Sequence, residues 1–208
     1  DRARGKTTAF GSALQGVLQG IGQRLFDGIV RGVGMVVTKM GEAVVASSNL
    51  TEASNKTSVV FGSSAEEMLA WSKTSATALG QSQRQALDAA AGFGALFIQM
   101  GNTRPEAAAM SQSLVKLASD LSSIYNIPMD SALEKIRAGL AGETEPLRAV
   151  NIFLNDNLVK NKAVAMGLAE TTAAVTDAAK VQARYALVLE QGAIANGDFA
   201  NTAKEFAN

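Results

Sequence analysis

The sequence predicts an all-α fold, in which a long N-terminal helix is followed by a compact array of helical hairpins. Apolar residues recur at helical spacing through the first part of the chain, and helix-start signals recur after it in alanine-rich runs. We therefore expect an amphipathic oligomerisation helix at 1–46, a polar connector at 47–56, a compact helical domain at 57–154 and a helical extension at 155–208.

The first region carries an uninterrupted apolar stripe with steps of three and four residues. It has no proline from Lys6 to Ala46, and its period is closer to an eleven-residue repeat than to a heptad, so the helix should be nearly straight. At about 1.5 Å per residue it would reach roughly 60 Å. The stripe comprises Phe10, Leu14, Leu18, Ile21, Leu25, Ile29, Val33, Val36, Met40 and Val44.

Glycine is unusually frequent in this helix, although each glycine costs roughly 0.5–1 kcal/mol relative to alanine. Glycines four residues apart let a partner backbone approach closely, so we expect a coiled-coil-like helix that associates with its own copies or with another surface. A flexible amphipathic segment is the alternative. The predicted oligomer interface is Leu14, Gly16, Leu18, Gly20, Ile21, Leu25, Gly28, Ile29, Gly32, Val33, Val36 and Met40.

The most apolar run in the chain, residues 28–46, also raises the question of a membrane. Arg31, Lys39 and Glu42 interrupt it, whereas a spanning helix needs about 20 predominantly apolar residues with few charges. The run therefore does not qualify as a resting transmembrane span. Interfacial or induced insertion is the alternative.

Helix-start signals punctuate the second region. Three pairs match the reciprocal capping box, and they predict helices that begin near residues 64, 82 and 104; the pairs are Ser64 with Glu67, Ser82 with Gln85, and Thr103 with Glu106. Pro105 fits the first turn of the third helix. The matching stops are Gly80, Gly101 and the Asn126–Pro128 step.

Large apolar residues at helical spacing mark the expected core. Asp130 is placed to cap a further helix that carries Leu133, Ile136 and Leu140. The other predicted core residues are Met68, Leu69, Trp71, Leu87, Phe93, Leu96, Phe97, Met100, Met110, Leu114, Leu117, Leu121 and Ile124.

The stretch GLAGETEPLRAV, residues 139–150, interrupts the helical runs. Gly142 should end one helix, Thr144 should cap the next, and Pro146 should lie in its first turn. The segment therefore predicts a turn between two helices, one that returns Leu147, Val150, Ile152 and Leu154 to the core. Glu143 and Glu145 could suggest a glycosidase pair, but adjacent turn residues seldom face each other across a substrate.

The third region predicts a helix capped by Asn155 or Asp156, a break at Gly167, and a helix over 171–195, with a further stop and restart at Gly197 and Asp198. In the last of these helices one edge is apolar and another should be solvated; the apolar edge has Val181, Tyr185 and Val188, and the solvated side has Lys180, Arg184 and Glu190.

Composition narrows the function classes. The chain has 19 basic and 19 acidic side chains, scattered along it, whereas recognition of nucleic acid through phosphates needs clustered Lys and Arg. It has no Cys and no His, which excludes thiol nucleophiles, Ser-His-Asp triads, disulfides and ordinary zinc sites. We therefore expect no catalytic residue, no cofactor and no metal. The first residue is Asp1, so we expect a portion of a longer chain, made in a reducing cytoplasm.

Several segments together resemble the conserved domain of tail tape measure proteins of long-tailed (siphovirus-type) bacteriophages. The resemblance covers about residues 50–208, and its most specific parts are GETEPLR, RYALVLEQ and GDFANT. One departure is Val150-Asn151-Ile152, which stands where the family pattern has Leu-Gly-Ile. Asparagine tolerates a positive φ less freely than glycine, so the backbone at Asn151 becomes a point to examine.

The resemblance implies a structural protein with no substrate. Proteins of this family lie in the lumen of the tail tube or at the tail tip, set tail length during assembly, and leave when DNA is ejected. It also implies assembly in the bacterial host cytoplasm, self-association, commonly as three copies, and contacts with the tail tube protein, with distal tail and tail tip proteins, and with tail assembly chaperones.

Two other function classes stay open at the level of sequence. One is a membrane-active segment that forms a channel for genome passage through the host envelope, suggested by the glycine-rich apolar helix. The other is a cell-wall hydrolase, for which the sequence offers neither histidine ligands nor a well-separated carboxylate pair.

Overall fold

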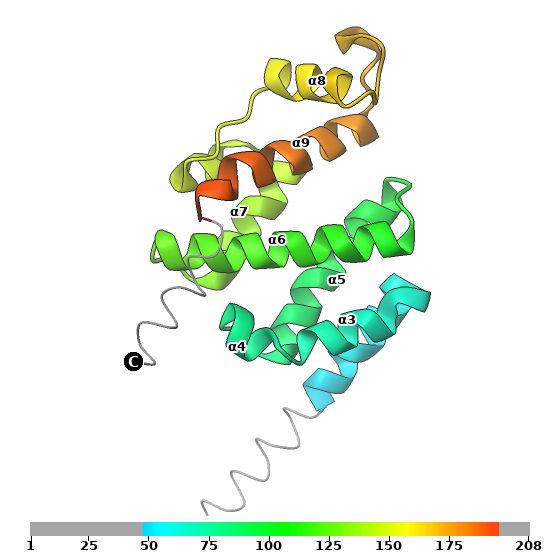
Figure 1. The fold of residues 1–208 in the computed structure, drawn as a ribbon, viewed down its shortest axis with the longest axis vertical. Coiled ribbons are helices and arrows are strands. Elements are labelled where there is room, and N and C mark those ends of the chain that lie inside the picture. Colours follow the sequence, from blue (N-terminus) through cyan, green and yellow to red (C-terminus); the bar gives the residue numbers. More distant parts are fainter. Residues whose placement is uncertain (1–47, 196–208) are drawn as a thin grey trace, which may run out of the picture. The chain divides into compact units, whose positions relative to one another are not determined.

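The computed structural model describes residues 48–195, and all regular elements in this range are helical (Figure 1). The chain divides into two units, Asp1–Asn49 and Leu50–Asn208, and the described residues belong almost entirely to the second. The predicted all-α class is therefore confirmed for the described range. The predicted long helix at 1–46 lies outside it, as do Gly197 and Asp198.

Short turns connect the helices. Residues 48–61 are helical, so most of the predicted polar connector belongs to a helix. The elements that follow are η1 (Gly62–Ser64), α3 (Ala65–Ser72), α4 (Ser75–Leu79), α5 (Gln83–Gln99), α6 (Arg104–Ile124), α7 (Met129–Ala141), η2 (Glu145–Val150), α8 (Asp156–Ala165), η3 (Thr172–Ala174), α9 (Asp177–Gly192) and η4 (Ala193–Ala195).

The α5–α6 pair forms the centre of the core, and these two helices share the largest helix–helix contact among the described elements. Phe93 and Phe97 of α5 and Leu114 and Leu121 of α6 are almost completely buried, as the sequence predicted. Ile124 is different, because it is 42 % exposed in the last turn of α6. The predicted apolar stripe therefore ends one turn before the helix does.

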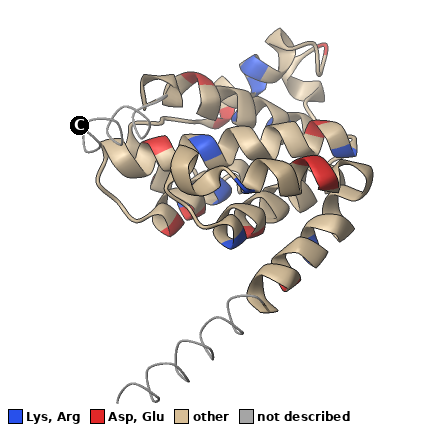
Figure 2. Cartoon of the chain, turned by 60° about the horizontal axis from the view of Figure 1, so that its bottom comes forward, with Lys and Arg blue, Asp and Glu red and all other residues tan. Residues whose placement is uncertain are grey.

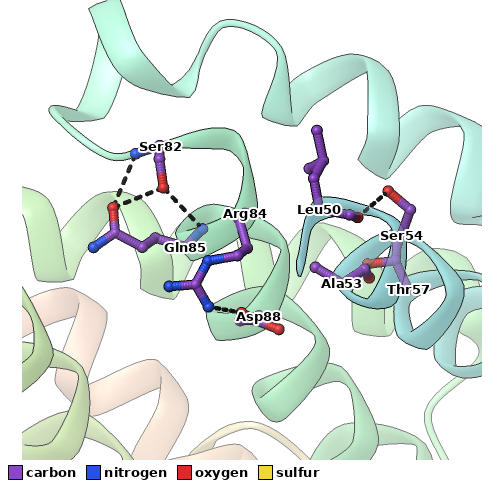
Figure 3. A network of polar contacts seen from close by, with 8 residues as sticks. All are labelled: Leu50, Ala53, Ser54, Thr57, Ser82, Arg84, Gln85 and Asp88. Carbon is purple, nitrogen blue, oxygen red and sulfur yellow. Dashed lines mark hydrogen bonds and ion pairs between the residues drawn. The ribbon is translucent and has the colours of Figure 1, made fainter. Parts of the chain in front are cut away.

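Two of the three predicted capping boxes form. Ser82 precedes α5 and exchanges hydrogen bonds with Gln85, whose Oε1 accepts from the Ser82 N–H at 3.1 Å (Figure 3). Thr103 precedes α6, and the Glu106 carboxylate accepts from its N–H at 2.8 Å. Both capping residues have extended backbone, the geometry an N-cap needs.

Three other predicted caps are wrong. Ser64 ends the 3-10 turn η1, and with ψ near 2° it makes no capping hydrogen bond through its side chain. Thr144 also has helical backbone and makes none. Helix α7 begins before Asp130, with Pro128 as its N-cap, so the carboxylate lies within the first turn. There it still complements the positive helix end.

The predicted stops are confirmed. Gly80, Gly101 and Gly142 all have positive φ where helices end, and Asn126 takes the same left-handed conformation after α6. Asn151 also has a positive φ, of 56°. Asn151 thus adopts the left-handed conformation that glycine favours.

The last helix begins later than predicted. Residues 171–176 contain the 3-10 turn η3, and α9 starts only at Asp177, because Thr176 is extended and its hydroxyl accepts a hydrogen bond from the Ala179 N–H at 3.2 Å. Helix α9 packs against α6, α7 and α8. The segment expected as an extension from residue 155 therefore shares the core up to Ala195.

Charges of both signs are interspersed over the described helices (Figure 2). The ion pairs between them mostly join neighbouring turns of one helix, as Arg84 and Asp88 do at 3.1 Å. This distribution agrees with the scattered charges of the sequence.

Candidate functional site

The predicted oligomer interface, from Leu14 to Met40, lies outside the described residues, and so does the apolar run at 28–46. Within residues 48–195, no helix combines the length and the hydrophobicity that a membrane span requires. The described part does include GETEPLR (142–148) and RYALVLEQ (184–191), two of the three segments that carry the family resemblance. The structure brings these two segments into contact, and their junction is the candidate site.

The corner between α7 and α8 is built first by local contacts. Gly142 ends α7 with a φ of 112°, and the N–H groups of Gly142 and Glu143 both donate to the carbonyl of Ala138, at 3.0 and 2.9 Å. Pro146 lies at the start of η2, as predicted. The chain therefore leaves α7 in a tight reversal that only a residue tolerant of positive φ allows.

Leu147 fixes this corner to α7. Its side chain is fully buried and lies against the backbone of Gly139, where a Cβ would overlap it. After η2, the left-handed Asn151 lets the Ile152 N–H donate to the Leu147 carbonyl at 3.1 Å. Ile152 and Leu154 then point into the core, as the sequence predicted.

Arg184 of α9 holds the beginning of the corner. Its Nη1 donates to the carbonyl of Leu140 at 3.1 Å, and Nη2 lies 3.0 Å from where a Cβ on Gly142 would be. Burial lowers the pKa of this guanidinium, while Asp156 and Asp177 act in the opposite direction. A cation here also complements the negative C-terminal end of α7. Arg184 was predicted to be solvated; that prediction is wrong, because its head group is needed at the corner.

Gln191, two turns further along α9, holds the other end of the corner. Its Oε1 accepts from the Phe153 N–H at 2.7 Å, and its Nε2 donates to the Phe153 carbonyl at 3.0 Å. One side-chain amide thus pairs with both backbone groups of an extended residue, as a neighbouring strand would. Because Ile152 and Leu154 on either side are buried, the Phe153 ring points outward and is 55 % exposed.

The same helix is anchored to the core between these two contacts. The Tyr185 ring meets Phe97 of α5 edge-on, with ring centres 5.5 Å apart. Burial raises the pKa of the Tyr185 hydroxyl, and a hydrogen bond with Ser113 of α6 opposes that rise. Lys162 of α8 pairs with Glu190. RYALVLEQ therefore connects the corner, α8 and the central helices through successive side chains.

The two glutamates of the corner are placed as turn residues. Glu143 is exposed, and Glu145 pairs with Arg148 at 3.0 Å with its side chain 79 % exposed. An open groove of about 480 Å³ lies between α5 and α7, but its charged lining is Arg84, Asp88, Asp130, Glu134 and Arg137, so neither corner glutamate belongs to it. Residues 48–195 hold no cluster of three or more carboxylates that could bind a metal ion.

No protein-family model, no curated protein and no solved structure matches the chain. The candidate site therefore stands on its geometry.

Two residues of the site were missed at the level of sequence. Arg184 and Gln191 lie about 40 residues from the groups they bind; Arg184 was assigned to the solvated side of its helix, and Gln191 was not singled out. The helical spacing places Arg184 beside Lys180, on the side expected to be solvated, so it carried no signal for a buried partner.

Proposed function

We propose that the chain is part of a tail tape measure protein of a long-tailed bacteriophage, a structural protein that sets tail length during assembly, occupies the tail tube lumen or the tip, and is released at DNA ejection. The observation that carries the proposal is the junction of GETEPLR with RYALVLEQ. Two segments that together support the resemblance in sequence lie against each other at Gly142 and Arg184, and Arg184 also binds the carbonyl of Leu140, just before the first segment.

The form of that junction favours a positional role over a reactive one. Two of its polar side chains bind backbone groups: Arg184 Nη1 binds a helix end, and Gln191 binds both backbone groups of Phe153. The groups around them are leucine, isoleucine and asparagine side chains that fill the turn. Such an arrangement fixes the path of the chain and is suited to a folded element that must keep its shape in an assembly.

In this proposal the two units have separate tasks. Residues 1–46 associate with their symmetry mates, as a trimer, and the compact helices anchor the chain against tube wall or tip proteins. The ruler itself lies elsewhere in the chain, because a helix converts residue number into length at about 1.5 Å per residue whereas a compact hairpin array does not.

In-frame deletions in the phage that encodes the chain test this division. Removing about 22 residues from the extended helical ruler should shorten the tail by about 33 Å. The same removal between Ser64 and Val150 should abolish tails, because it takes out α5, α6 or the corner. Tails of normal number and length after the second deletion would contradict the proposal. Point variants test the same proposal more specifically. Leu147→Arg should block tail assembly, and Ile124→Arg on the exposed end of α6 should not.

A further inference from the structure

The helix of residues 48–61 is attached to the core by a narrow contact. In this range only Ala53, Thr57 and Phe61 are buried, at a spacing of four, so they form a single line along the helix. Phe61 is the one large side chain among them. By comparison α6 buries ten of its 21 residues. The free energy of packing helix 48–61 on the core therefore comes largely from the burial of one aromatic ring.

That ring has a specific seat. Phe61 is fully buried and lies directly against the backbone of Gly94 in α5, where a Cβ would overlap the ring edge; Val60 also approaches, with Cγ1 3.1 Å from the same position. Val59, one residue earlier, is 78 % exposed. The Phe61 ring thus occupies the space that a side chain at position 94 would fill, and we call this space the notch on Gly94.

Three hydroxyl groups of the helix form hydrogen bonds within the helix. The Ser54 hydroxyl donates to the Leu50 carbonyl at 2.8 Å (Figure 3). The hydroxyls of Thr57 and Ser58 also donate to the carbonyls four residues earlier, at 2.8 and 3.0 Å. Such back-bonding slightly destabilises and bends helices. Even the buried Thr57 hydroxyl therefore donates to a carbonyl of its own helix.

A hinge follows the ring directly. Gly62 has a φ of 52°, and the Arg104 guanidinium covers its open side. Positive φ at glycine allows the chain to turn sharply between helix 48–61 and α3. A helix, one anchoring ring and a glycine with positive φ thus follow one another along the chain.

We propose that helix 48–61 is a detachable arm, released from the core when Phe61 leaves its notch on Gly94, with Gly62 as the hinge. Tension applied at residue 48 removes the arm first, while α5, α6 and the corner held by α9 stay folded. The chain then lengthens by a fixed step without loss of the core. This inference does not depend on the proposed function.

Optical-tweezers measurements on the 208-residue chain test the proposal. The sequence has no cysteine, so Ser48→Cys and Ile194→Cys provide two exposed points for the handles. The arm should leave in an early, reversible step that releases about 12–14 residues, each contributing about 3.5 Å of contour length. Unfolding of the rest should follow at higher force. One all-or-none transition would overturn the proposal.

Two variants locate the anchor. Phe61→Ala should shift the early equilibrium about 100-fold towards the detached arm and leave the later transition in place. Gly94→Ala should do the same by filling the notch, and Val59→Ala is the matched control that should change neither step. Equal effects of Phe61→Ala and Val59→Ala would contradict the assignment. If Phe61→Ala abolishes folding of the whole chain, the arm is not detachable and the proposal fails.

Discussion

The backbone of two turns in this molecule is fixed by different kinds of contact. The α5–α6 turn is made mainly by its own residues: Gly101 has positive φ, and the Thr103–Glu106 capping box starts α6. Helix α9 adds one long contact there, from Gln182 Nε2 to Asn102 Oδ1 at 3.5 Å. The corner after α7 begins with a similar glycine, Gly142, but Thr144 caps nothing. Besides its local bonds and Leu147, this corner is held at both ends by Arg184 and Gln191 of α9.

The difference shows what a folded helical unit can encode locally and what it cannot. A capping box satisfies orphan amides at the helix that carries it, so it works without the rest of the fold. In the corner, the Leu140 carbonyl and both backbone groups of Phe153 need α9 in place before they are satisfied. The first turn should therefore form early and alone, and the second should depend on tertiary packing.

The largest effect is expected from breaking the corner at its apolar centre. Leu147→Ala should lower the free energy of unfolding by about 3 kcal/mol, because the side chain is fully buried against Gly139. Chemical denaturation measures this loss in the free energy of unfolding. Ile124→Ala, at a residue 42 % exposed, should cost less than about 1 kcal/mol. If the two variants are equally stable, the corner is not part of the core.

A smaller loss should follow from removing the polar hold of α9. Arg184→Met keeps much of the apolar stem but loses the bond to the Leu140 carbonyl, and we expect a loss of about 1–2 kcal/mol. Arg148→Met is the matched control, since the Arg148–Glu145 pair is exposed and should contribute less than about 0.5 kcal/mol. Similar values for both would mean that Arg184 acts only as a surface charge.

The local turn can be tested in the same way. Thr103→Ala should cost about 1 kcal/mol, the usual contribution of an N-cap side chain. Thr144→Ala should cost almost nothing, because Thr144 makes no side-chain cap bond. Combined with Arg184→Met, the Thr103→Ala effect should be additive, since separate sites contribute independently. A thermal-denaturation series of the single and double variants would reveal any coupling, which would argue against two separate mechanisms.

The smallest expected effect is a difference in how the stability of the two capping boxes depends on pH. Hydrogen bonds from the Thr103 hydroxyl and N–H lower the pKa of Glu106 below its usual value. A carboxyl with a lower pKa in the folded state stabilises that state above its unfolded pKa of about 4.3, and this contribution is lost as pH falls through the folded pKa. The Ser82–Gln85 box has no ionisable group.

Acidification should therefore accelerate amide exchange at the start of α6 and leave the start of α5 unchanged, after correction for the intrinsic rate. Peptide-resolved hydrogen exchange at pH 6 and below pH 4 measures both in one sample. The Glu106→Gln variant should remove the difference, because a neutral amide can cap at either pH. Equal acceleration at both helix starts would show a global effect of acid instead.

The sequence allowed the local features to be predicted well and the distant ones poorly. Ser82, Thr103, Gly101 and Gly142 were identified because their chemistry acts on neighbours within a few residues. Ser64 failed because the chain enters α3 through a 3-10 turn, and the capping pattern alone does not reveal the preceding backbone.

The site was predictable only in part. The sequence indicated that residues 139–150 form a turn whose apolar residues return to the core, and the structure confirms this. The spacing of apolar residues did not indicate which helix would bind the free carbonyl at the end of α7. That depends on how α9 docks, and docking brought Arg184 to a place where a solvated residue had been expected.

Hydrogen exchange of the Arg184→Met/Gln191→Ala double variant tests most directly whether α9 holds the corner. We predict that amides at 152–153, including the Phe153 N–H that donates to Gln191, exchange at least about tenfold faster than in the unmodified chain, whereas those at 106–107 in the self-contained α6 start keep their rates. Unchanged exchange at 152–153, or equal acceleration at both places, would contradict the account.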